Sequence, residues 1–168
     1  MPGTIPKASI VADSSTATGL KWAAPAGGGK VLQVVSATYS TYVQNNTTNF
    51  ADTGITASIT PSSATSKILV VVHQNGCGKS SQNADNNLKI NLLRGATEIV
   101  ADFAGSAGFT NSALYNNNGT CSISYLDEPN TTSSTTYKTR FKNNSNSIAV
   151  FVQSGDSTST ITLLEIGA

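Results

Sequence analysis

The residues that could carry out acid–base, nucleophilic or metal chemistry are few and scattered. His73 is the only histidine among 168 residues, so any histidine-dependent catalytic triad must use it. It ends an apolar strand, and no nucleophile motif around a serine or cysteine matches it, which favours a structural role. The nine Asp and Glu residues show no spacing that places two carboxylates across a sugar or several around a metal. The sequence therefore predicts a non-enzymatic protein without a cofactor or a metal site.

The most tempting motif is Gly78-Lys79-Ser80, because Gly-Lys-Ser after a strand is typical of phosphate-binding loops. The full motif needs a glycine at the position of His73, and a following helix whose amides hold the phosphate. Residues 81–87 are poor helix formers, so nucleotide binding is not expected. Cys77 and Cys121 lack metal-ligand spacing. Two buried thiols are favoured over one disulfide, and the disulfide stays an open alternative.

The composition excludes several classes of partner. Charged residues make up 11% of the chain and the formal net charge is +1, which gives no field to attract nucleic acid or an anionic membrane. No apolar run approaches the roughly 18 residues of a membrane span, so membrane insertion is not expected. Ser, Thr and Asn together account for 60 of the 168 residues, and these side chains form hydrogen bonds without adding charge. Because few Lys and Glu residues protect the strand edges, we expect other copies of the chain to cover them.

The elements that must position these residues are predicted to be β-strands throughout. The unbroken apolar run Ile68–Val72 lies between turn residues and predicts a central strand that is buried on both faces or nearly so and ends at Asn75-Gly76. Alternating apolar residues predict further strands, at 31–40, 55–60, 88–93, 98–103, 120–126, 136–142, 148–153 and 159–166. Arg94-Gly95-Ala96 would join two of them as a hairpin. About nine or ten short strands without helical periodicity are typical of an antiparallel β-sandwich, and a jelly roll fits this strand number best.

Residues 1–30 differ in composition from residues 31–168, which form the predicted head domain. Three prolines and the run Gly27-Gly28-Gly29 indicate an extended N-terminal arm closed by a flexible hinge. The arm contains apolar side chains that must be buried against something, namely Ile5, Ile10, Val11, Leu20 and Trp22. They either pack on the chain's own head domain or anchor it to a neighbouring subunit or a larger assembly.

Two further features could contact a ligand. The loop at 104–119 contains Phe109, Tyr115 and the run Asn116-Asn117-Asn118, which could stack on a glycan and hydrogen-bond to it, or form a solvated loop tip. Lys138, Arg140 and Lys142 alternate along one face of a strand. This basic stripe is either a solvated face or a contact for an acidic partner or a polysaccharide.

Several segments resemble small β-sandwich proteins and fibre-tip domains of tailed bacteriophages. They are 10–22 (IVADSSTATGLKW), 31–36 (VLQVVS), 59–63 with 66–70, 124–127 with 129–132, and 159–166 (STITLLEI). The resemblance implies a virion component, commonly a homotrimer, with no enzymatic residues to carry over. The segment at 13–22 is similar to the joint that precedes the tips of longer tail fibres.

With its short arm, the chain is expected to be a knob on the exterior of the phage particle, assembled in the host cytoplasm. The arm would bind the major capsid protein or another virion protein. Because the sequence starts at Met1 with no shaft before the arm, capsid decoration is favoured over a tail-fibre tip that binds a host surface glycan. A bacterial carbohydrate-binding module is the second alternative.

Overall fold

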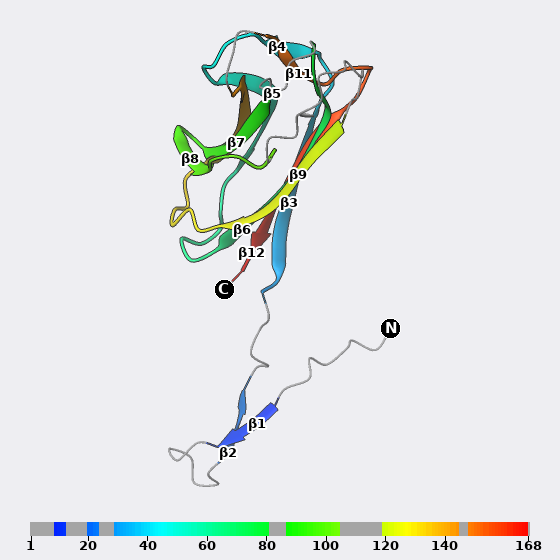
Figure 1. Ribbon diagram of the computed structural model, residues 1–168. Coiled ribbons are helices and arrows are strands. Elements are labelled where there is room, and N and C mark those ends of the chain that lie inside the picture. The colour runs from blue at the N-terminus through cyan, green and yellow to red at the C-terminus, as the bar shows by residue number, and fades with distance from the viewer. Residues whose placement is uncertain are drawn as a thin grey trace.

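The computed structural model describes residues 9–12, 20–23, 29–80, 87–104, 119–144 and 148–167. All twelve regular elements in these ranges are β-strands, and all their pairings are antiparallel. Ten of the twelve strands build two sheets that pack face to face (Figure 1). The described chain is an all-β antiparallel sandwich, which confirms the fold class predicted from the sequence.

The larger sheet contains six of the described strands. Its long members are β3 (Val31–Tyr39), β12 (Ser159–Ile166), β6 (Lys67–Lys79) and β9 (Gly119–Asp127), in that spatial order. Two short strands, β4 (Val43–Asn45) and β11 (Val150–Val152), join the sheet at the last residues of β6. Because β6 pairs with both β12 and β9, it is the central strand, as its apolar run predicted.

The smaller sheet has the order β5 (Ala51–Ile59), β10 (Thr135–Asn143), β7 (Leu88–Arg94), β8 (Thr97–Val100). β7 and β8 form a hairpin through Gly95, whose φ of 57° suits a tight turn, and this confirms the predicted hairpin. The chain passes from one sheet to the other at each step of the series β3, β5, β6 and β7. It does so again at each step of the series β8, β9, β10 and β12. Strands from distant parts of the sequence therefore become neighbours in each sheet.

The apolar core lies between the two sheets. Side chains alternate between the core and the outer faces along β5, β10 and β12, where nearly every second residue is buried. The main cluster consists of Ile55, Ala57, Ile59, Ile68, Val70, Val72, Leu92, Tyr137, Ile161 and Leu163. A second cluster consists of Cys77, Leu88, Ile90, Ala104, Cys121, Phe141, Val150 and Val152. Full burial of each large aliphatic side chain stabilises the fold by about 1.5–3 kcal/mol.

A buried layer of uncharged hydrogen bonds lies between the two clusters on β5, β6 and β10. The hydroxyl oxygens of Thr53 and Thr139 are 2.6 Å apart, and Thr139 donates to Gln74 Oε1 at 3.1 Å. Gln74 Nε2 and Gln153 Nε2 both donate to Ser159 Oγ, at 2.9 and 3.0 Å. All five residues are buried, so these bonds replace contacts with water that folding removes. The layer links the two sheets without any charge.

The burial of β6 differs from its prediction. Its inward residues Ile68, Val70 and Val72 are fully buried, but the outward residues Leu69 and Val71 are only half-buried. Of the burial that was predicted on both faces or nearly so, the structure shows full burial on the inner face only, because the larger sheet packs against the smaller one through a single face.

The end of β6 also differs from its prediction. The strand does not end at Asn75-Gly76 but continues to Lys79 through a bulge, where its register to β9 shifts between Gln74 and Cys77. Gly76 has a φ of 61°, and a Cβ there would lie 2.3 Å from the backbone nitrogen of Ser154. The glycine that suggested a turn allows instead a bend within the strand.

The described N-terminal residues form a hairpin. β1 (Ser9–Ala12) pairs antiparallel with β2 (Leu20–Ala23), and this register places Ile10 opposite Trp22. Within the predicted extended arm, these two short segments are therefore paired with each other. Apolar and aromatic residues in both segments favour strand pairing.

Candidate functional site

The predicted anchoring residues lie partly within the described structure. The hairpin brings Ile10, Val11, Leu20 and Trp22 onto two paired strands, and the side chain of Ile10 is 56% exposed. Ile5 lies outside the described residues. The predicted glycan-contact residues also lie outside them, namely Phe109, Tyr115, Asn116, Asn117 and Asn118.

The phosphate-loop motif lies in a sheet. Gly78 pairs with Phe151 and Lys79 pairs with Val150, so both are strand residues and not part of a loop that opens a helix.

His73 has one side-chain hydrogen-bond partner among the described residues. It lies on the outer face of β6, where its Nδ1 is 3.0 Å from Ser122 Oγ on β9. The described residues hold no group of three His, Cys, Asp or Glu side chains that could bind a metal ion. They also form no helix long and apolar enough to cross a membrane.

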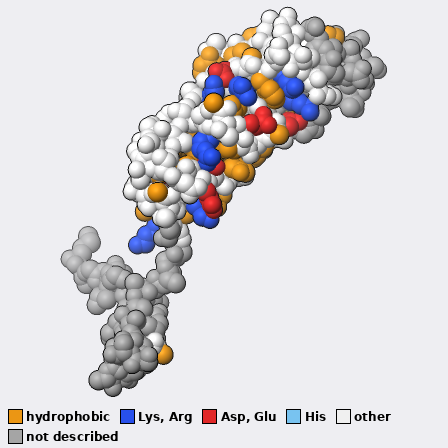
Figure 2. All heavy atoms as spheres, turned by 90° about the vertical axis from the view of Figure 1, so that its left-hand side faces the viewer, with side chains coloured by type: hydrophobic (Ala, Val, Ile, Leu, Met, Phe, Trp, Pro, Cys, Tyr) orange, Lys and Arg blue, Asp and Glu red, His pale blue; other side chains and the backbone are white. Residues whose placement is uncertain are grey.

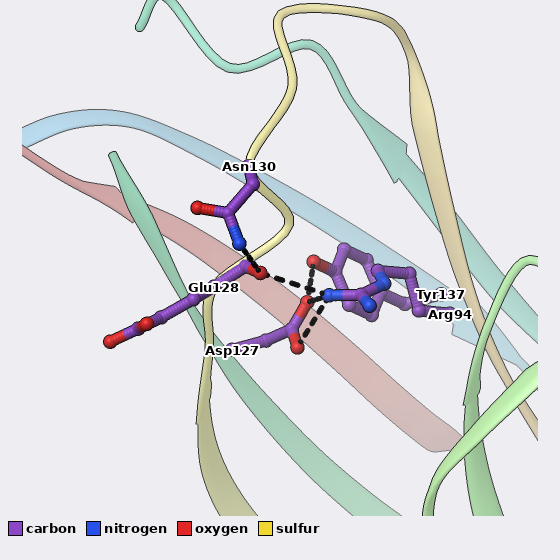
Figure 3. Close-up of polar contacts among 5 residues, drawn as sticks. All are labelled: Arg94, Asp127, Glu128, Asn130 and Tyr137. Atoms are coloured by element: carbon purple, nitrogen blue, oxygen red, sulfur yellow. Dashed lines mark hydrogen bonds and ion pairs between the residues drawn. The ribbon is translucent and has the colours of Figure 1, made fainter. Parts of the chain in front are cut away.

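A buried carboxylate connects both sheets at one end of the sandwich (Figure 3). Asp127, the last residue of β9, accepts two hydrogen bonds of 2.9 Å from Arg94 Nη1 and one of 2.6 Å from the Tyr137 hydroxyl. Arg94 Nη1 also donates to the backbone oxygen of Glu128 at 3.1 Å. Burial, together with the hydrogen bond to Asp127 and its negative charge, raises the pKa of Tyr137 above its usual value. Each charged or hydroxyl group in this cluster has a hydrogen-bond partner within it, so the cluster holds β7, β9 and β10 together rather than acting as a reaction centre.

A second buried carboxylate holds the turn before β6. Glu165 is fully buried, and its Oε1 accepts hydrogen bonds from the backbone nitrogen and the hydroxyl of Ser62, at 2.8 and 2.6 Å. Its Oε2 accepts a hydrogen bond of 2.7 Å from Gln33 Nε2. Burial alone would raise the pKa of Glu165, but these hydrogen bonds outweigh it and lower the pKa to about 2. Glu165 is therefore ionised at neutral pH and has a structural role.

Cys77 and Cys121 are both buried and not joined by a disulfide, in agreement with the favoured prediction. Cys77 Sγ donates to the backbone oxygen of Gln74 at 3.1 Å. A hydrogen bond with the Cys121 side chain, and then burial, raise the pKa of the Cys77 thiol well above its usual value. At neutral pH this thiol is a weak nucleophile.

The outer face of the larger sheet carries an apolar row across four strands. Val34 of β3 is paired with Leu164 of β12, which is paired with Leu69 of β6, which is paired with Leu126 of β9. Val34 and Leu126, at the two ends of the row, are 57% and 48% exposed. The next two rows contain Ser, Thr, Val and His side chains. Along this paired stretch of the described strands, the only outward side chain with a formal charge is Lys67, at its end.

The outer face of the smaller sheet has the opposite character. Figure 2 views the molecule from this side and shows Lys, Arg, Asp and Glu side chains gathered over it. The predicted basic stripe Lys138, Arg140 and Lys142 faces outward on β10, while Tyr137, Thr139 and Phe141 face the core, as predicted. Lys138 Nζ lies 3.0 Å from Asp52 Oδ1.

Sequence reasoning missed the apolar row. A signal was present, because several strands place two apolar residues side by side where strict alternation expects one, as in Val34-Val35, Ile68-Leu69 and Leu163-Leu164. The pairing of these positions across four strands could not be known without the register.

No protein-family model matches the chain, and no curated protein matches it either. The resemblance to phage proteins therefore rests on the sequence segments named above.

Proposed function

We propose that the chain is a non-enzymatic structural protein of a tailed bacteriophage. It would be a homotrimeric knob on the exterior of the particle, assembled in the host cytoplasm and held by its N-terminal segment. The observation that carries the proposal is the uncharged outer face of the larger sheet, with its exposed apolar row.

Large apolar side chains that lie side by side on an uncharged outer face mark a candidate interaction surface. Further copies of the chain are the partners that fit best, because three uncharged faces can meet around a threefold axis without repulsion and without needing a complementary charge. Four strands and seven residues span a flat area of about 450 Å² at ~4.8 Å per strand and ~3.4 Å per residue. This is roughly half of the ~800 Å² that each partner contributes to a standard interface. The face would thus form the centre of the interface, and neighbouring edges would complete it.

The strand order supports a virion role. Apart from the short strands β4 and β11, the two sheets have the orders β3-β12-β6-β9 and β5-β10-β7-β8, and the chain crosses between the sheets on either side of the β7–β8 hairpin. We infer that this is a jelly roll, an architecture found in viral capsid proteins and also in lectin domains. Fold alone does not assign function, so the proposal also depends on the segments that resemble phage proteins.

The test is the mass of the purified protein in solution, measured by light scattering after size exclusion. We expect a trimer, and we expect the double variant Leu69→Lys with Leu164→Lys to be a folded monomer, because two charges would then face each other in the interface. The matched control adds two lysines to the opposite side of the molecule, as Ser58→Lys with Ala101→Lys, and should remain a trimer. A monomeric unmodified protein would refute the proposal.

Attachment is tested separately. A variant that lacks residues 1–26 should keep its sandwich and its trimer but no longer associate with phage shells. Normal incorporation of this variant would refute the anchoring role of the N-terminal segment. A tail-fibre tip, the alternative, would bind host cells through its head whether or not the segment is present.

A further inference from the structure

The outer face of the smaller sheet presents three cations without an acidic partner among the described residues: Lys89, Arg140 and Lys142. Lys142 on β10 is directly paired with Lys89 on β7, and Arg140 lies two residues before Lys142 on the same face. A fourth cation, Lys138, is already paired with Asp52. Glu98, another acid on this sheet, accepts a hydrogen bond from Asn91 Nδ2.

This arrangement works against the stability of the isolated chain. Like charges directly opposite each other on paired strands are destabilising, and no described carboxylate relieves the repulsion between Lys89 and Lys142. A local arrangement that opposes folding and has no carboxylate to neutralise it is typical of a functional site.

An aromatic ring holds two of the cations in place. Arg140 Cζ lies 5.3 Å and Lys142 Nζ 4.9 Å from the centroid of the Phe50 ring. Cation–π contacts of this kind orient the two charged groups but do not neutralise them. The ring thus keeps the positive charges close together on the surface, ready for an anionic ligand.

We propose that Lys89, Arg140, Lys142 and Phe50 form a binding site for an acidic polysaccharide, a glycan whose sugars bear carboxylate groups. The cations would pair with carboxylates, and the exposed neutral side chains around them, Thr56, Thr136 and Asn144, would hydrogen-bond to sugar hydroxyls. An outer sheet face suits an extended polymer that lies along the strands.

Nucleic acid fits this face less well. Three cations are fewer than the roughly six to ten phosphate contacts of a typical DNA-binding protein. The proposed site does not depend on the virion role. It lies on the sheet opposite the proposed trimer interface, so either proposal can fail without the other.

The experiment measures binding of the full-length protein to immobilised polygalacturonate, with neutral dextran as the reference polymer. At about 50 mM salt we expect binding to polygalacturonate and none to dextran, and at about 300 mM salt we expect weaker binding, because salt screens exposed charges. The double variant Lys89→Gln with Lys142→Gln should bind roughly 10- to 30-fold more weakly, the fold-change that corresponds to ~1 kcal/mol for each cation at an anionic surface.

The matched control is Lys30→Gln with Lys67→Gln, which removes the same net charge away from this face and should bind within about twofold of the unmodified protein. Phe50→Leu keeps an apolar side chain but loses the cation–π contacts, so it should bind several-fold more weakly. Thermal melts establish that each variant is folded. Equal weakening in the two double variants, or no binding at low salt, would overturn the site. Equal or tighter binding to poly-glutamate or duplex DNA would overturn the assignment to an acidic polysaccharide.

Discussion

Replacing Asp127 by Asn tests whether the buried carboxylate locks the sandwich. The asparagine has nearly the same shape but no charge, and its amide can no longer accept hydrogen bonds from both Arg94 and Tyr137 in their present geometry. Tyr137 is fully buried, so loss of its charge-assisted hydrogen bond costs about 1.5–3 kcal/mol. The side chain of Arg94 is 31% exposed and keeps access to water, so its share is about 0.5–1 kcal/mol.

The two contributions together predict that Asp127→Asn lowers the free energy of unfolding by about 2–4 kcal/mol. For a chain of this length, this corresponds to a fall in Tm of roughly 5–15 °C. Chemical denaturation and calorimetry measure both quantities. Tyr137→Phe should cost about 1.5–3 kcal/mol by itself and much less when Asp127 is already Asn, because the two side chains share one hydrogen bond.

The control is Lys67→Gln, which breaks the exposed ion pair of Lys67 Nζ with Glu128 Oε1 (2.7 Å) close to the same end of the sandwich. Exposed pairs contribute little, so its effect should lie below about 1 kcal/mol. If Lys67→Gln costs as much as Asp127→Asn, or if the Asp127 and Tyr137 substitutions are additive, the reasoning about burial is wrong.

Further predictions concern pH, backbone strain and reactivity. The pKa of Glu165 is about 2 in the folded chain against 4.5 in the unfolded one, so its contribution to stability is complete above pH 4.5 and lost as the pH falls towards 2. Glu165→Gln should therefore reduce the loss of stability at acid pH, as measured by denaturation curves over a series of pH values. Gly54→Ala should cost roughly 2–5 kcal/mol, because φ is +91° and the new Cβ would lie 2.2 Å from the Tyr39 ring, whereas Gly95→Ala, with open space around it, should cost only about 1–2 kcal/mol. Both cysteines should react with a thiol reagent only as fast as the protein unfolds, which labelling rates compared with unfolding rates will check.

The pH dependence of stability tests the hydrogen bond between Tyr137 and Asp127 in a second way. Its pKa is raised above the unfolded value of 10.0, so its contribution to stability is complete below pH 10 and lost as the pH rises further. The unmodified protein should therefore lose stability above pH 10 more steeply than Tyr137→Phe does. Parallel alkaline limbs in the two proteins would show that the tyrosine is not held in its neutral form.

Much of the strand pattern could be predicted because side-chain alternation is a local property. In β10, three cations alternate with Tyr137, Thr139 and Phe141. Because the cations must face solvent, this pattern predicts that the other three side chains face inward, as the structure shows. The β7–β8 hairpin was also predictable, because its turn lies between two apolar strands and contains Gly95 at a positive φ.

The contacts that depend on pairing between distant strands could not be predicted. In the sequence, Asp127 has the appearance of a turn residue before Pro129, yet its partner Arg94 lies 33 residues away. In the same way, the apolar run of β6 fits a strand covered on both faces as well as one whose outer face is open. Only the register, which places Leu69 between Leu164 and Leu126, shows that the open face is apolar across its whole width.

The two proposed surfaces have a joint consequence. If three copies meet through the uncharged faces of their larger sheets, the basic faces of their smaller sheets point away from the threefold axis, and one trimer presents three equal sites. A long polygalacturonate chain could then engage more than one site, and its avidity would exceed the affinity of a single site by about 100-fold or more. A short oligomer could engage only one.

The monomeric variant Leu69→Lys with Leu164→Lys should therefore lose affinity for the long polymer while keeping its affinity for a short oligogalacturonate, as measured by titration calorimetry. Equal loss for both ligands would mean that the charge on the larger sheet affects the site directly, and the separation of the two faces would be refuted.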